Sequence, residues 1–197
     1  AVKAYKYISK AYILDSTNLK YINTMGEFLA IVQEYDEALL VMNRSIKVDS
    51  NQWTPYNAKG NIYKSKKQYG QAINQFDLAL KRVTVDSIKV GVLINRSTSK
   101  IKLRKFESAL EDLKLAYSID SSNSPLFLGL GNVYSDLGKS DTAKLYYDKS
   151  LEVNPRSSRA WLNVGFQLQS KENRHFWVVK TINFESNVAN STLDDFI

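Results

Sequence analysis

Few residues of this chain stand at spacings that a catalytic or metal site would require. A nucleophile needs a base within hydrogen-bond reach, and a metal needs several ligands. His175 is the single histidine, and no second ligand or base lies at a recognisable spacing from it. The chain has no cysteine, which excludes disulfides, thiolate metal sites and a cysteine nucleophile. Adjacent carboxylates would point to different faces of a helix, as at Asp36–Glu37, Glu111–Asp112 and Asp194–Asp195. The sequence therefore predicts no enzyme and no cofactor.

Basic side chains are the second group that could act on a partner, because the chain has a net charge of +7. Such a charge suits an acidic protein, a nucleic acid or an anionic surface, but it also arises from solvated lysines. Two basic runs stand out, and stacking of the elements that carry them would merge them into one edge. They comprise Lys64, Lys66 and Lys67, then Lys100, Lys102, Arg104 and Lys105. No base-reading motif accompanies them, so nucleic acid is the less favoured partner.

A repeat of 34 positions sets where these residues lie. Two amphipathic helical patterns fill each period, which is typical of a helical repeat array. Between Ala72 and Ala109 the step is 37, so three extra residues fall within 83–89 as a longer helix or a longer loop. Small residues recur at the 34-residue step as Gly26 and Gly60, Ala38 and Ala72, Ala109 and Ala143, and Gly131 and Gly165.

These columns of small and large residues resemble the tetratricopeptide repeat family. The first helix of each unit carries a small residue, at Gly26, Gly60, Ser97, Gly131 and Gly165. The second helix carries an alanine, at Ala4, Ala38, Ala72, Ala109 and Ala143. Four residues later it carries a large residue, at Ile8, Met42, Phe76, Leu113 and Tyr147. Departures are the charged Arg96 and Lys100 and the bulky Trp177 at positions where the family has apolar or small residues.

The resemblance implies an all-α fold, a right-handed superhelical solenoid of about five stacked antiparallel helix pairs. Residues 1–18 would be the second helix of a truncated repeat, as in a trimmed or processed chain. The expected units are 19–52, 53–89 with the three-residue insertion, 90–123, 124–157, a degenerate unit or cap at 158–185, and an acidic tail at 186–197. That tail could occupy a basic groove. No apolar run reaches the roughly 20 residues that span a bilayer, and the compartment stays open.

By the same resemblance, the first helices line a concave groove that holds a protein or a linear peptide. Two columns would face the groove, and their asparagines would pair across units as Asn61 with Asn95 and Asn132 with Asn163. An amide offers a donor and an acceptor to an extended backbone. The chaperone-binding carboxylate clamp of the family is absent, because Asn57, Pro125 and Gly129 stand at its basic positions. Lys64 and Lys102 near the groove would favour an acidic ligand.

The predicted function is thus a non-catalytic protein-interaction module. The predicted peptide-binding residues are Asn57, Asn61, Lys64, Asn95, Lys102, Asn132 and Asn163. One alternative is a scaffold segment that self-associates by stacking its ends, since the helix at residues 1–14 lacks a partner helix of its own. The other alternative is a nucleic-acid binder that uses the basic edge.

Overall fold

The computed structural model describes residues 2–167, and within them the chain is all α-helical. The helices are α1 (Val2–Leu14), α2 (Leu19–Ile31), α3 (Tyr35–Val48), α4 (Thr54–Ser65), α5 (Tyr69–Leu80), α6 (Asp86–Lys102), α7 (Phe106–Ile119), α8 (Ser124–Asp136), α9 (Ser140–Val153) and α10 (Ser158–Gln167). The expectations for His175, Trp177, the second helix of the last repeat and the tail lie outside the described residues. No helix in the described range has the length and apolarity that crossing a membrane requires.

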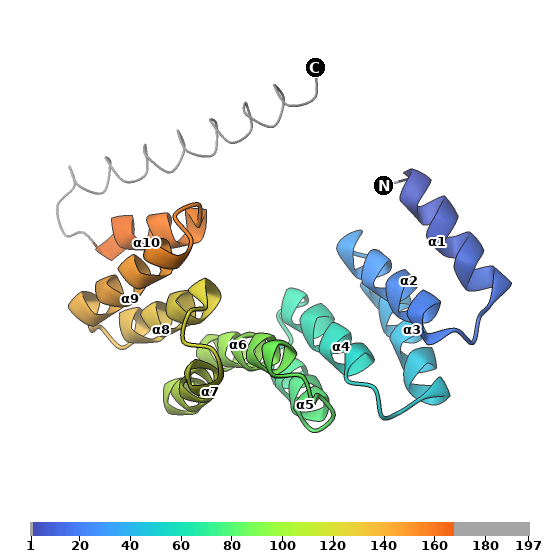
Figure 1. Cartoon of the computed structure of the whole chain (residues 1–197), viewed down its shortest axis with the longest axis horizontal. Coiled ribbons are helices and arrows are strands. Elements are labelled where there is room, and N and C mark those ends of the chain that lie inside the picture. The colour runs from blue at the N-terminus through green and yellow to red at the C-terminus, as the bar shows by residue number, and fades with distance from the viewer. Residues whose placement is uncertain (1, 168–197) are drawn as a thin grey trace, which may run out of the picture. The chain divides into compact units, whose positions relative to one another are not determined.

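The chain divides into two compact units, residues 1–105 and 106–197. In the first unit α2 packs on α3, α4 on α5, and each pair on the next (Figure 1). In the second unit α8 packs on α9, with α7 and α10 on either side of that pair. The fold is therefore an all-α helical-repeat solenoid, as predicted. The right-handed superhelical turn of the array stays a prediction, as do the repeat boundaries.

Local sequence signals account for the helix ends. Asn18 and Asn123 cap α2 and α8, where their side-chain oxygens accept hydrogen bonds from backbone N–H groups of the first turn. Pro55 and Pro125 lie in the first turns of α4 and α8, where a missing N–H costs nothing. Asp and Asn in the loops bond to backbone two residues on, as at Asp49.

The three extra residues lengthen a helix and not a loop. α6 has 17 residues, whereas α2, α4 and α8 have 12 or 13. All four end five residues after their small residue, so α6 has gained about one turn at its N-terminus. This outcome decides between the two alternatives that the sequence left open. The lengthened helix keeps its C-terminal end in register with α4.

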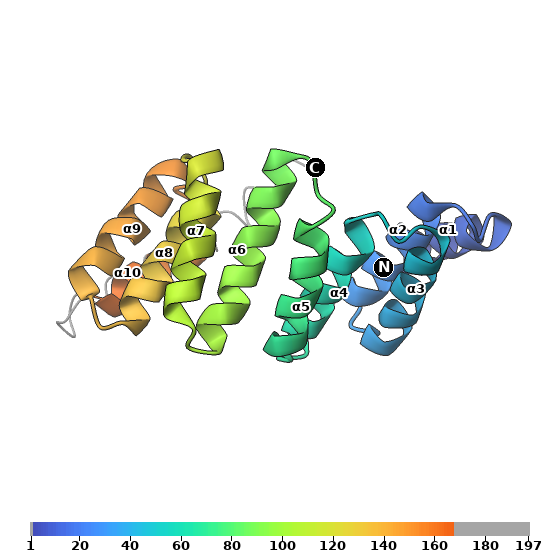
Figure 2. The same cartoon turned by 90° about the horizontal axis from the view of Figure 1, so that it is seen from below.

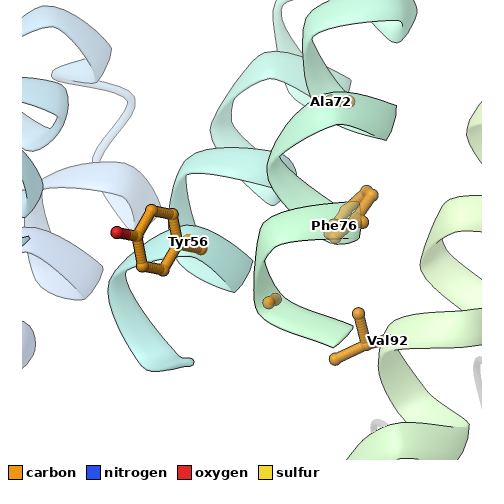
Figure 3. Close-up of a cluster of buried hydrophobic side chains, with 5 residues drawn as sticks. Tyr56, Ala72, Phe76 and Val92 are labelled. Carbon is orange, nitrogen blue, oxygen red and sulfur yellow. The ribbon is translucent and has the colours of Figure 1, made fainter. Parts of the chain in front are cut away.

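Close approach of paired helices explains the columns of small and large residues. A Cβ added to Gly60 would lie 2.5 Å from the ring of Phe76, and one added to Gly26 would lie 2.5 Å from the Met42 methyl. Gly131 and Tyr147 stand in the same relation in the second unit. Tyr56 of α4, Phe76 of α5 and Val92 of α6, which Figure 3 labels, belong to one cluster of buried side chains. The glycine leaves the space that the large side chain fills.

Candidate functional site

Three of the predicted peptide-binding residues share one face of α4. Asn57, Asn61 and Lys64 follow one another at intervals of four and three residues, which places their side chains one above the other. All three are half-buried. Tyr56, Gly60 and Ile62 of the same helix are buried against its neighbours, and this packing fixes the orientation of α4. The sequence therefore builds a polar strip on a helix whose other side is core.

Lys64 and Asn95 meet across successive first helices. The Lys64 ammonium donates a hydrogen bond of 2.6 Å to the Asn95 side-chain oxygen, which joins α4 to α6 within the first unit. No hydrogen bond joins the expected Asn61–Asn95 pair within the described residues, and the Asn95 oxygen accepts from Lys64 instead. Asn61 makes no side-chain hydrogen bond within the described part of the chain. Its amide therefore keeps both a donor and an acceptor for another molecule.

Asn57 differs from its equivalent in the preceding repeat. Asn23, 34 residues earlier, accepts a 2.6 Å hydrogen bond from the Ser45 hydroxyl and donates one of 3.1 Å to Gln52. The Asn57 side-chain oxygen is buried and accepts no hydrogen bond from the described residues. Ala79 occupies the position equivalent to Ser45, so the hydroxyl that would satisfy this oxygen is missing. A buried acceptor without a donor costs roughly 1–3 kcal/mol.

The second unit brings its two predicted residues together. Asn163 of α10 donates a 2.9 Å hydrogen bond to the Asn132 oxygen on α8. The Tyr147 hydroxyl of α9 donates to the same oxygen at 3.1 Å. Burial raises the pKa of Tyr147 to about 12, because the phenolate would lose its hydration. Asn132 is therefore held from two sides, and part of its hydrogen-bonding capacity serves the fold.

Lys102 lies apart from the other predicted residues of the first unit. It is the last residue of α6 and is exposed. The residue in register with Lys64 is Ile101, which is buried. Lys102 therefore belongs to the turn that follows α6 and not to the strip on α4.

Other charged groups near these helices have identifiable partners or environments. Arg96, which departs from the family pattern, forms an ion pair of 2.5 Å with Asp77 of α5. Desolvation raises the pKa of the Glu27 carboxyl on α2 and lowers the pKa of the Lys59 ammonium on α4. The Lys59 ammonium also donates to Asn43 at 2.8 Å. The polar groups of these helices thus include amide and ammonium groups, which are hydrogen-bond donors suited to binding a carbonyl or a carboxylate.

Asn23 is a residue that the sequence reasoning left out of the set. Its position 34 residues before Asn57 was the signal that could have found it. The structure gives it a structural part, because both ends of its amide are used within the first unit. Among the predicted asparagines, Asn57 and Asn61 make no side-chain hydrogen bond within residues 2–167, and the Asn57 oxygen is buried.

The comparisons with known proteins agree with this architecture. The tetratricopeptide repeat family model matches residues 54–82 and 124–157. These two segments are therefore tetratricopeptide repeats. YrrB, described as a repeat protein of this kind with an unusual peptide-binding site, is a similar solved structure. It aligns with a TM-score of 0.63 and 22% identity, over 96% of this chain and 98% of its own.

Curated relatives of this repeat protein are longer than the chain. RNA polymerase II-associated protein 3 of Homo sapiens is 29% identical over 133 residues, which are 66% of this chain and 20% of that protein. Heat shock protein STI1 of Saccharomyces cerevisiae is 33% identical over 106 residues, which are 53% of this chain and 18% of that protein. The chain thus spans about a fifth of the length of these relatives.

Proposed function

We propose that this repeat protein is a non-catalytic interaction module that holds an extended segment of a partner protein against its first helices. One observation carries the proposal: Lys64 of α4 contacts Asn95 of α6 beside an Asn61 amide with unused capacity. The contact makes one polar surface from two successive first helices. Amide groups at such a surface bind a peptide backbone independently of its sequence. The peptide-binding site named for YrrB, which has the same fold, supports this reading.

The test compares paired alanine variants in a pull-down from cells of the source organism. Asn61→Ala with Asn95→Ala removes the amides from the polar surface. Asn51→Ala with Asn74→Ala is the matched control, because both residues are exposed outside that surface. The proposal expects a partner that the control retains and the first pair loses, with unchanged helicity by circular dichroism. Equal retention by both pairs would place the binding surface elsewhere.

Asn132 is left out of this test for a structural reason. Its oxygen accepts from the buried Tyr147 hydroxyl, so an alanine there would remove one hydrogen bond of that buried group. A lost partner would then report a weakened fold as readily as a missing contact. Asn163→Ala is the better probe of the second unit, because Asn132 keeps its bond to Tyr147.

Self-association through α1 is the second candidate function. Tyr7, Ile13 and Leu14 of α1 are 72%, 76% and 76% exposed, which is unusual for large apolar side chains that lie close together in sequence. A second copy of the chain could cover them. Sedimentation velocity over a range of concentrations tests this candidate, with Ile13→Glu and Leu14→Glu together as the variant. A monomer at every concentration would exclude it.

A further inference from the structure

The positive charge of the first unit is concentrated in α4–α6. Residues 53–105 contain 12 Lys and Arg against 2 Asp and Glu, whereas residues 1–52 contain 6 of each. Both acidic residues of 53–105 are engaged: Asp77 pairs with Arg96, and Asp86 lies in the first turn of α6. An acidic residue there is stabilised by the helix dipole. The basic side chains of this segment thus outnumber its carboxylates, and Lys67, Lys102 and Lys105 are among those exposed to solvent.

Part of this charge gathers at one end of the helix pairs. The turn after α4 contains Lys66 and Lys67. Lys102 ends α6, and Arg104 and Lys105 lie in the turn that follows it. We call these five residues the basic turn edge. Lys66 forms a 2.7 Å ion pair with Asp36 at the start of α3, so successive turns lie at the same end. α4 also contacts α6, so the turn that follows α6 lies beside the turn that follows α4. In Figure 2 these turns lie along the lower side of the first unit.

The corresponding turn of the first repeat, at the same end of the helix pairs, is acidic. Glu34, Asp36 and Glu37 occupy the turn after α2 and the start of α3. The Lys66–Asp36 pair shows that this edge accepts a carboxylate in direct contact. A long polyphosphate chain that followed the edge would meet these three acidic residues. A short acidic segment would fit over the two basic turns alone.

The exposed apolar side chains also favour an acidic protein segment over a nucleic acid. Single-stranded nucleic acid is bound by stacking its bases on exposed aromatic side chains. Among residues 53–105, the large apolar side chains that are exposed are Val85 and Leu103, which flank α6, and neither is aromatic. Charge without a stacking surface suits carboxylates better than nucleotides.

We propose that the basic turn edge is a docking surface for an acidic segment of a partner protein, one rich in Asp and Glu. Exposed ammonium groups of Lys67, Lys102 and Lys105 contact the carboxylates of that segment. The surface lies at the end of the first helices and uses no asparagine of the proposed groove. It therefore adds a second contact to the proposed function, and either contact can fail alone.

The experiment measures fluorescence anisotropy of a labelled peptide of alternating Glu and Ser with the full chain. The test variant carries Lys67→Gln, Lys102→Gln and Lys105→Gln. The control carries Lys6→Gln, Lys10→Gln and Lys20→Gln, which are also exposed and in the first unit. Both variants lose the same net charge, so a difference between them reports position. We expect the test variant to weaken peptide binding about tenfold and the control less than about threefold, since exposed charges act mainly within a Debye length of roughly 10 Å.

Each other outcome has a definite meaning. Absence of peptide binding by the unaltered chain at low salt overturns the proposal. Equal weakening by both variants also overturns it, because net charge alone would then explain the binding. Tighter binding of a single-stranded DNA that responds to the same variant would assign the edge to nucleic acid. Asn61→Ala with Asn95→Ala should leave peptide affinity unchanged, and a loss of affinity there would overturn the proposal that the edge is a separate docking surface.

Discussion

Single side chains of this protein show how one substitution between repeats creates an unsatisfied group. Asn23 and Asn57 occupy the same position in successive repeats, and Ser45 and Ala79 do so on the following helices. The Ser45 hydroxyl satisfies the Asn23 oxygen at 2.6 Å. The Asn57 oxygen is buried without such a donor. The structure thus contains both the satisfied and the unsatisfied form of one local arrangement.

Restoring the missing hydroxyl should stabilise the first unit. Ala79→Ser places a donor where Ser45 stands in the earlier repeat, and we expect the free energy of unfolding to rise by about 1 kcal/mol, because a buried acceptor gains its hydrogen bond. Urea unfolding followed by circular dichroism measures the change. In an Asn57→Ala background the same substitution should give no gain, so a double-mutant cycle isolates the bond. An equal gain in both backgrounds would show that the serine acts through another group.

Helix pairs provide the next scale, and their geometry depends on glycine at contact positions. Gly60→Ala would place a Cβ 2.5 Å from the buried Phe76 ring. We expect a loss of stability of about 1 kcal/mol or more, because overpacking costs about 1–3 kcal/mol and exceeds the helical preference for alanine of about 1 kcal/mol. The shift of the urea midpoint measures it.

Gly91→Ala is the matched control for that substitution. Gly91 lies within α6, is exposed, and a Cβ there would meet no atom within 4 Å. Alanine should therefore stabilise the protein by about 0.5–1 kcal/mol through backbone entropy alone. A loss of stability at position 60 together with a gain at position 91 would show that the loss at position 60 comes from packing. A loss at both positions would contradict the packing explanation.

The α8–α9 pair has a pH dependence that follows from one buried phenol. Burial raises the pKa of the Tyr147 hydroxyl to about 12, from an ordinary value of about 10. The folded state therefore binds this proton more tightly than the unfolded state. The protonated hydroxyl contributes fully to the free energy of unfolding below about pH 10, and this contribution falls as the pH rises toward 12. The loss amounts to at most about 3 kcal/mol, since one pKa unit is about 1.4 kcal/mol. Urea midpoints measured from about pH 9 to about pH 11 test this fall.

Tyr147→Phe separates this effect from the titration of other tyrosines. The variant loses the hydrogen bond to Asn132, so it should be less stable near neutral pH by about 1 kcal/mol. Its stability should fall less steeply above about pH 10, because phenylalanine has no proton to lose. Identical slopes for the two proteins would show that Tyr147 does not control the alkaline stability.

Much of the helical architecture followed from periodicity, because each repeat imposes the same packing on the same columns. The contact between Gly60 and Phe76 could be predicted from the sequence alone, because the small residue and the large residue each recur at the 34-residue step. The partner of Asn95 could not be predicted in this way. The Lys64 ammonium donates to the Asn95 oxygen, and the spacing of the columns does not reveal which side chain will do so. The unsatisfied Asn57 oxygen likewise needed coordinates, because spacing does not report burial.

At the scale of the whole molecule, charge is distributed by unit and not evenly. Residues 1–105 hold 18 Lys and Arg against 8 Asp and Glu, while residues 106–197 hold 9 against 12. The formal net charge of +7 is therefore the sum of a strongly basic unit and a mildly acidic one. A partner that meets the chain encounters two surfaces of different character. Electrostatic steering would bring an acidic partner to the first unit.

This distribution predicts that salt stabilises the protein in the absence of a partner. The excess of ten positive charges in residues 53–105 repels itself in the folded state, and the Debye length falls from about 10 Å at 0.1 M to about 3 Å at 1 M salt. The urea midpoint should therefore rise with sodium chloride, while affinity for an acidic peptide falls. Lys67→Gln, Lys102→Gln and Lys105→Gln together should raise the low-salt midpoint and flatten its salt dependence, because they remove part of the repulsion. A midpoint that falls with salt would instead show that attractive pairs such as Lys66–Asp36 dominate the electrostatics. The cationic segment would then be stabilised by its own ion pairs and would not require an acidic partner to neutralise it.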